Sequence, residues 1–146
     1  IGPDEEAFSR VEPEFKEKVE FLSRERLLEM EETEVSAFVK NQVGEYPLYI
    51  SIDKDVLCET DADTNWSQGD MRLSTMLECL GAVKEKCAER ISRILGVDIC
   101  GECDVTEPGN SALNDMANAA LLEFFTSTDV GEDIEENKNG TTGGNG

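Results

Sequence analysis

The chain has 146 residues, of which 33 are acidic and 13 basic, so its formal net charge is −20; it has five cysteines and no histidine. This length is enough for one domain with a hydrophobic core. The negative charge excludes nucleic-acid binding by phosphate neutralisation, and the lack of histidine excludes a histidine base, a Ser-His-Asp triad or a histidine metal ligand within these residues.

The cellular setting follows from what surrounds this composition. No secretion signal precedes the first polar residues, and no apolar run approaches membrane-spanning length. An odd number of cysteines without such a signal is typical of reduced thiols. We therefore expect a cytoplasmic chain without a membrane partner, and its start at Ile1 suggests a piece of a longer protein. The sequence leaves a homo-oligomer open.

The first third of the chain predicts one short strand and one helix. Residues 1–17 are polar and contain two prolines, which favours a loop. The segment "KVEFLS" (18–23) alternates in character and is interpreted as a strand. Ser23 is a suitable N-cap for a helix whose apolar stripe continues to about Lys40.

The middle and last thirds repeat this order. The best strand signal is "LYISID" (48–53), which is rich in β-branched and aromatic residues. A polar loop follows at 58–70, and apolar periodicity then predicts a helix over 71–90. The apolar run at 91–100 predicts another strand, and a final helix is predicted over 111–125.

Alternating strands and helices predict an α/β fold with a mainly parallel sheet. The strands are nearly all apolar, as expected of strands that are covered on both faces. Residues 1–128 are therefore interpreted as one α/β unit. Residues 129–146 are acidic and glycine-rich and are predicted to be a disordered tail.

Two aspartates one residue apart, Asp53 and Asp55, end the best strand. Side chains alternate along a strand, so both would project to the same side, about 7 Å apart. Two carboxylates that close repel each other, and a hard divalent cation would compensate them. The alternative is that one aspartate caps the loop and the other is solvated. Asp98 and Glu102 are expected at the carboxyl end of the next strand, where sites of open α/β sheets form.

The segment "SIDKDVL" resembles the second metal motif of the arginase (ureohydrolase) family, in which S-x-D-x-D ends a central strand. The segment "TNWSQGDMRLSTMLECL" is similar to the family's Thr- and Gly-containing loop and the helix after it. The segment "ILGVDICGECDVTEPGN" is similar to its last strand and the polar loop that follows. The resemblance spans most of residues 1–127 and implies a three-layer α/β/α fold, of which this chain would be the C-terminal part.

The resemblance also implies chemistry. In the family, two Mn²⁺ ions share a hydroxide that attacks the guanidinium carbon of a small cationic substrate. By position, Asp53 would bridge both ions and Asp55 would hold one of them. Candidate substrate-binding residues are Glu102, near the place of the family's substrate-binding glutamate, and the loop residues Asn65 and Trp66. No catalytic residue is assigned within this chain.

The sequence departs from the family pattern at several points. The family's Gly-Gly-Asp-His and Asp-x-His-x-Asp segments do not occur, so the chain holds two of six expected ligands. Lys54 stands where an apolar residue is commoner, and Cys58 stands at the third acidic position. The position three residues after Asp98 is Gly101, so Glu102 comes one residue late.

Two alternatives stay open. The segment "CGEC" (100–103) is a C-x-x-C that suits a redox pair or half of a zinc site, but no second C-x-x-C accompanies it. The whole chain could instead be a non-catalytic α/β module that binds a ligand or a protein and lacks the metals.

Overall fold

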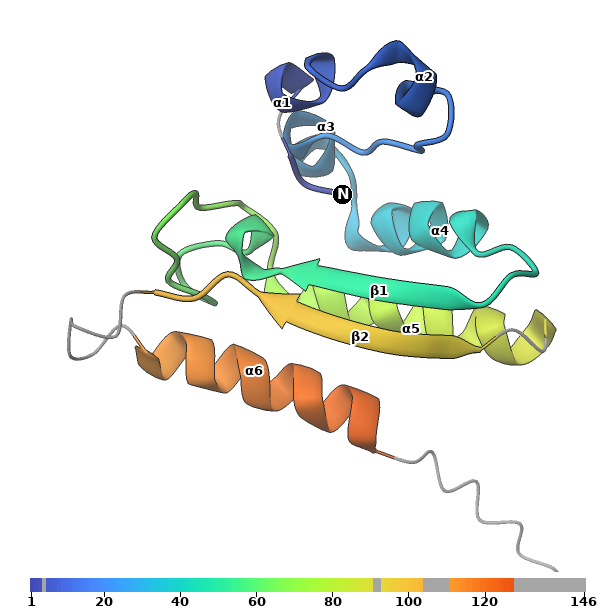
Figure 1. The fold of residues 1–146 in the computed structure, drawn as a ribbon. Coiled ribbons are helices and arrows are strands. Elements are labelled where there is room, and N and C mark those ends of the chain that lie inside the picture. The colour runs from blue at the N-terminus through green and yellow to red at the C-terminus, as the bar shows by residue number, and fades with distance from the viewer. Residues whose placement is uncertain (4, 91–92, 104–110, 128–146) are drawn as a thin grey trace, which may run out of the picture.

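The structure is a computed structural model that describes residues 1–3, 5–90, 93–103 and 111–127 (Figure 1). It contains helices α1 (Glu5–Ser9), α2 (Pro13–Lys16), α3 (Arg24–Glu29), α4 (Glu32–Gln42), α5 (Leu73–Arg90) and α6 (Ser111–Thr126), strands β1 (Leu48–Asp53) and β2 (Ile94–Cys100), and the 3-10 turn η1 (Lys54–Val56). The chain therefore belongs to the α/β class, as predicted. The predicted tail at 129–146 lies outside the described residues.

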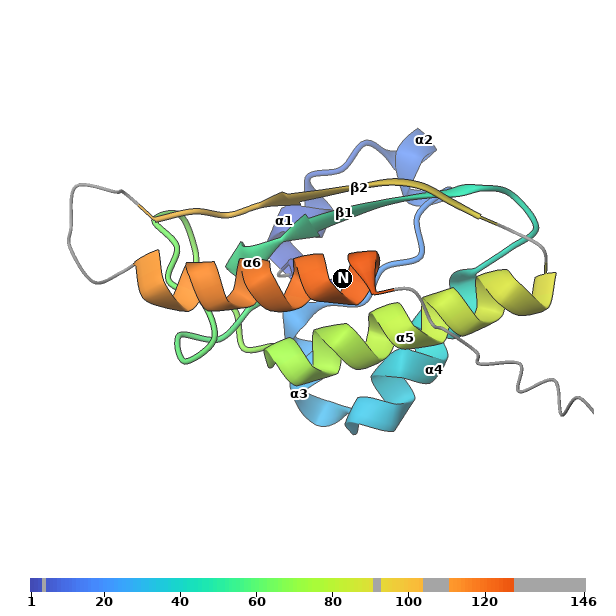
Figure 2. The same ribbon diagram turned by 90° about the horizontal axis from the view of Figure 1, so that it is seen from below.

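The strands β1 and β2 form a parallel two-stranded sheet. Apolar pairs face one side of it, such as Ile50 with Val97 and Ile52 with Ile99. Helices α5 and α6 lie against this side (Figure 2). The strands predicted at 48–53 and 91–100 and the helices predicted at 71–90 and 111–125 are confirmed to within three residues.

The main core lies between this side of the sheet and the two helices. Ile52 from β1 packs with Leu80 from α5 and Leu121 from α6, and all three are buried. A second cluster joins α4 to the same layer, since Val39 of α4 and Val43 just after it pack with Val83 of α5. One side of the sheet is thus covered by helices, and these helices alternate with the two strands along the chain.

The opposite side of the sheet is exposed in the part of the chain that the structure describes. Tyr49, Ser51 and Asp53 of β1 share it with Asp98 and Cys100 of β2, and all five are exposed. Ser51 donates a hydrogen bond to Asp98 over 2.7 Å, and the Tyr49 hydroxyl donates one over 3.1 Å. The expectation that both faces are covered does not hold for these residues, because only every second side chain of β1 points into the core.

The strand predicted at 18–23 is wrong. These residues are not part of the sheet; Leu22 instead accepts a backbone hydrogen bond from Gly2 over 3.0 Å. The alternation that suggested a strand has another cause. Leu22 is fully buried against α4 and α5, whereas the neighbouring Phe21 ring stacks on Phe8 with centroids 4.0 Å apart.

The single helix predicted after Ser23 is two helices. The Ser23 side chain accepts a hydrogen bond from the Arg26 amide, so the predicted N-cap is confirmed. The helix then ends at Met30, whose ψ of 144° is extended. A capping box between Glu31 and Glu34 then starts α4, so the apolar stripe predicted for one helix belongs to two.

Among the described residues, no helix has the length and apolar character that a membrane crossing requires.

Candidate functional site

The candidate site lies where β1 ends. Asp53 is the last residue of β1, and η1 begins at the next residue. The Asp53 carboxylate accepts a hydrogen bond from the Asp55 amide over 3.1 Å, which caps this turn. The alternation of a strand therefore does not extend to Asp55, and the prediction that both side chains project as strand neighbours is wrong.

Asp55 is half-buried, and its environment is unusual. Its Oδ1 atom is buried and has no hydrogen-bond partner among the described residues. A buried polar atom without a partner costs about 1–3 kcal/mol, more if it is charged. The sequence left open that one aspartate caps the loop and the other is solvated. Asp53 does cap the turn, but the buried Oδ1 atom of Asp55 is not solvated.

Between the two aspartates, Lys54 is fully buried. Its ammonium group donates hydrogen bonds to the carboxylate of Glu102 and, over 2.8 Å, to the side-chain oxygen of Asn118. Asn118 in turn donates to Glu102 over 3.0 Å. Lys54 comes from the start of η1, Glu102 from the segment after β2, and Asn118 from α6. We call Asp53, Lys54, Asp55, Glu102 and Asn118 the strand-end cluster.

In the strand-end cluster, the buried ammonium group of Lys54 is paired with the partly exposed carboxylate of Glu102. The hydrogen bond from Lys54 holds the pKa of Glu102 below its ordinary value, although burial opposes the shift. The Glu102 side chain is still 56% exposed, whereas that of Lys54 is 0% exposed. Glu102, predicted to bind substrate, thus already neutralises a buried lysine, and only its exposed part remains accessible.

Gly101 explains how the segment after β2 comes so close to the aspartates. It has φ +83°, and a Cβ at this position would lie 2.7 Å from Asp53 Oδ1 and 2.8 Å from the Lys54 nitrogen. Glycine is therefore required both by the backbone conformation and by the space. A side chain at this position would not fit, and the acidic residue of this segment is Glu102, one residue later.

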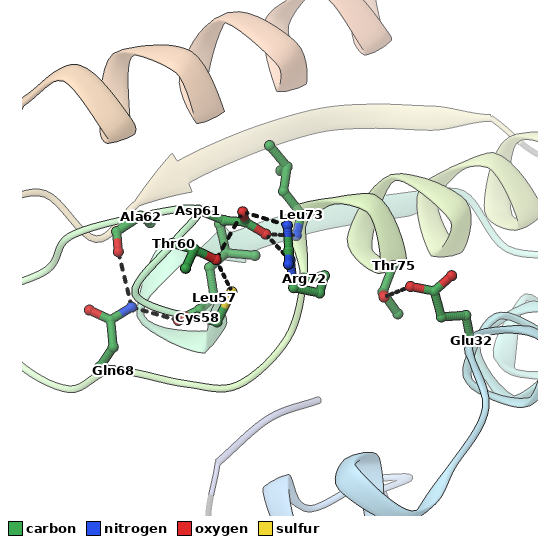
Figure 3. Close-up of polar contacts among 10 residues, drawn as sticks. All are labelled: Glu32, Leu57, Cys58, Thr60, Asp61, Ala62, Gln68, Arg72, Leu73 and Thr75. Atoms are coloured by element: carbon green, nitrogen blue, oxygen red, sulfur yellow. Dashed lines mark hydrogen bonds and ion pairs between the residues drawn. The ribbon is translucent and has the colours of Figure 1, made fainter.

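The loop between η1 and α5 is held by its own polar side chains (Figure 3). Asp61 accepts hydrogen bonds from the Leu73 amide over 2.7 Å and from Arg72 over 2.8 and 3.2 Å. Burial alone would raise the pKa of Asp61, but the Leu73 amide and Arg72 outweigh it and leave that pKa below its ordinary value. Asp61 thereby fixes the start of α5.

Two amide side chains hold the rest of this loop. Gln68 donates to the carbonyls of Leu57 and Ala62 over 2.6 and 3.1 Å. Asn114 of α6 accepts from the Asp63 amide over 2.9 Å and donates to the Asp63 carbonyl over 2.6 Å. The Gln68 amide is therefore committed to backbone atoms, whereas Asn114 also contributes a side-chain hydrogen bond that helps to lower the pKa of Glu102.

Two loop residues predicted to bind substrate, Asn65 and Trp66, are both exposed. Trp66 is 89% exposed and belongs to none of the buried apolar clusters. The structure brings Asp53, Asp55 and Glu102 together through Lys54 and Gly101, and it does not bring these two loop residues into that cluster.

All five cysteines are free thiols. In the C-x-x-C segment, Cys100 is exposed at the end of β2 and Cys103 is buried. Burial and the nearby carboxylates, Asp53 first among them, raise the pKa of the Cys100 thiol. A raised pKa makes a thiol a poor nucleophile at neutral pH, which does not favour the redox alternative.

Among the described residues, no group of three or more His, Cys, Asp or Glu side chains is arranged to hold a metal ion.

Sequence reasoning missed the buried positions of Lys54 and Asn114 and the hydrogen bonds of Asn118. One signal was available: Asn114 and Asn118 are four residues apart in a helix that is otherwise largely apolar, and polar residues at that spacing share one face. A lysine flanked by two aspartates on an apolar strand is a second such signal.

Comparison with known proteins adds one relative. The chain is 35% identical over 85 residues to an uncharacterized protein of Thermotoga maritima, a match that covers 57% of this chain and 32% of that protein. The chain thus spans about a third of the length of this relative. No family model matches the chain, and no solved structure matches it.

Proposed function

We propose that this chain is the C-terminal part of an arginase-like, metal-dependent hydrolase that cleaves a linear C–N bond of a guanidino or amidino compound. The parent would be a cytoplasmic enzyme with a three-layer α/β/α fold, and its metal ions would be Mn²⁺. The proposal rests on the resemblance of "SIDKDVL" to the family's metal motif.

One structural observation carries the proposal. Asp53 and Asp55 lie at the carboxyl end of a parallel strand, and Asp55 Oδ1 is buried without a hydrogen-bond partner in the described part of the chain. Natural proteins rarely leave such an atom unsatisfied. A hard cation held by carboxylate oxygens would satisfy it.

The residues present fit part of a metal site. Asp53 would bridge two ions and Asp55 would hold one, and the other ligands would come from polypeptide outside this chain. Bound metal ions supply a strong nucleophile from water at neutral pH, which an unreactive guanidinium group requires. Asp53 would also keep the turn in place through its bond to the Asp55 amide.

The remaining residues of the strand-end cluster suit a cationic substrate. The exposed part of Glu102 supplies negative charge, and Lys54 fixes its position from the buried side. The net charge of −20 adds an attractive field for a cation.

An assay of the intact protein that contains this chain tests the proposal. It would be incubated with Mn²⁺ and a panel of arginine, agmatine and formimino compounds, and urea or ammonia release would be measured. Release that depends on Mn²⁺ and is lost in Asp53→Asn, but not in the exposed α6 variant Asp115→Asn, is expected. No release from any guanidino or amidino compound would contradict the proposal.

A further inference from the structure

A groove of about 400 Å³ runs along the outer edge of β1, which is the edge away from β2. All six residues of β1 line it, together with Ile1, with Val39 of α4 and Val43 just after it, and with Leu80 and Val83 of α5. The described residues of β2 are absent from the lining. A groove that touches consecutive residues of one strand follows the edge of that strand. In Figure 1 this edge lies on the side of α4 and of the N-terminus.

Backbone groups of β1 point into this groove. The Leu48 amide donates to the carbonyl of Arg93, next to β2, over 2.9 Å. Hydrogen-bonding groups alternate sides along a strand that pairs in parallel, so Ile50 and Ile52 also bond towards β2. Tyr49 and Ser51 consequently direct their amides and carbonyls to the outer edge. No described β-strand pairs with that edge.

Between Leu48 and Ile52 the edge lacks three features that often protect a free sheet edge. Such edges usually carry a lysine, a proline or a bulge. From Leu48 to Ile52 the strand has no charged residue and no proline. The register shift opposite Leu48 and Tyr49 places the extra residue, Leu95, on β2 rather than on β1.

We infer that this edge of β1 pairs with a further β-strand supplied by polypeptide of the same protein outside these 146 residues. The relative from Thermotoga maritima supports this source, because the match covers only 32% of its length. The strand would place apolar side chains into the groove between β1, α4 and α5. The pairing does not depend on metal binding.

Amide hydrogen exchange of β1 tests the inference, with Ile50 and Ile52 as internal controls for the β2 pairing. It would be measured in EDTA, on the 146-residue chain and on the intact protein. In the chain alone, the Ile50 and Ile52 amides are protected while those of Tyr49 and Ser51 exchange quickly. In the intact protein, the Tyr49 and Ser51 amides should exchange at least about 100-fold more slowly.

Three outcomes would overturn the inference. The first is unchanged fast exchange at Tyr49 and Ser51 in the intact protein. The second is protection that rises with the concentration of the chain alone, which would show that a second copy occupies the edge. The third is a gene that encodes nothing beyond these residues. Because no metal is present, a failed hydrolase assay would leave this result unaffected.

Discussion

Replacement of Glu102 by alanine is expected to destabilise the fold more than replacement of its buried partner, Lys54, by methionine. Glu102→Ala leaves a fully buried ammonium group with Asn118 as its remaining side-chain partner. Breaking a buried ion pair in this way costs about 3–5 kcal/mol. The Glu102 side chain is 56% exposed, so water can partly replace it. We therefore expect a smaller loss, of about 2–3 kcal/mol.

Lys54→Met removes the charge together with the cost of burying it. Methionine has a similar length and keeps the packing, while Glu102 can be hydrated and still accepts a hydrogen bond from Asn118. The expected change is within about 1 kcal/mol of the wild type. The double variant should resemble Lys54→Met, so the second substitution rescues the first.

Urea unfolding followed by circular dichroism measures these free energies. Glu123→Ala, on the exposed face of α6, is a matched control and should stay within about 0.5 kcal/mol of the wild type. Equal stability of Glu102→Ala and the wild type would refute the reasoning. A double variant less stable than Glu102→Ala would refute it as well.

Three further predictions concern the segments around the site. Gly101→Ala should lower the free energy of unfolding by about 2 kcal/mol, measured by urea unfolding, because its Cβ would lie 2.7 Å from Asp53 Oδ1 at φ +83°; an unchanged midpoint would contradict the close approach. Asp61→Ala should cost about 1–2 kcal/mol in the same assay and increase exchange of the first amides of α5, since it removes the acceptor for the Leu73 amide; unaltered exchange there would argue against this cap. The pKa values of Asp61 and Glu102 are lowered in the folded state, so the unfolded state binds more protons as the pH falls below about 4, and the unfolding midpoint should drop between pH 5 and pH 3; Asp61→Asn should show a smaller drop.

The sequence predicted the elements whose periodicity is set by burial in the main core. Helix α5 was found because buried side chains such as Leu80 recur with the period of a helix, and β1 was found because it is rich in β-branched and aromatic residues. The segment 18–23 misled because its alternation comes from Leu22 in the core and Phe21 stacked on Phe8, without any partner strand. Periodicity records which side chains are buried, and it does not record whether the backbone is paired.

The candidate site was predicted only in part for a related reason. Motif resemblance located Asp53 and Asp55, which are local in sequence. The partners of Lys54 come from 48 and 64 residues further along the chain. Such pairing depends on where α6 packs, and the spacing of Asn114 and Asn118 in the sequence does not specify that position. The resemblance drew attention to Gly101 as a departure from the expected pattern, but it did not predict the close approach of Gly101 to Asp53.

The metal content of the intact protein tests the central claim most directly. Wild type, Asp53→Asn, Asp55→Asn and the exposed control Asp115→Asn would be loaded with Mn²⁺, desalted and analysed by mass spectrometry of the metal. The account predicts two ions in the wild type and the control, fewer than one in Asp53→Asn, and about one in Asp55→Asn, because only Asp53 would touch both ions. The same metal content in all four preparations would contradict the assignment of these aspartates as ligands.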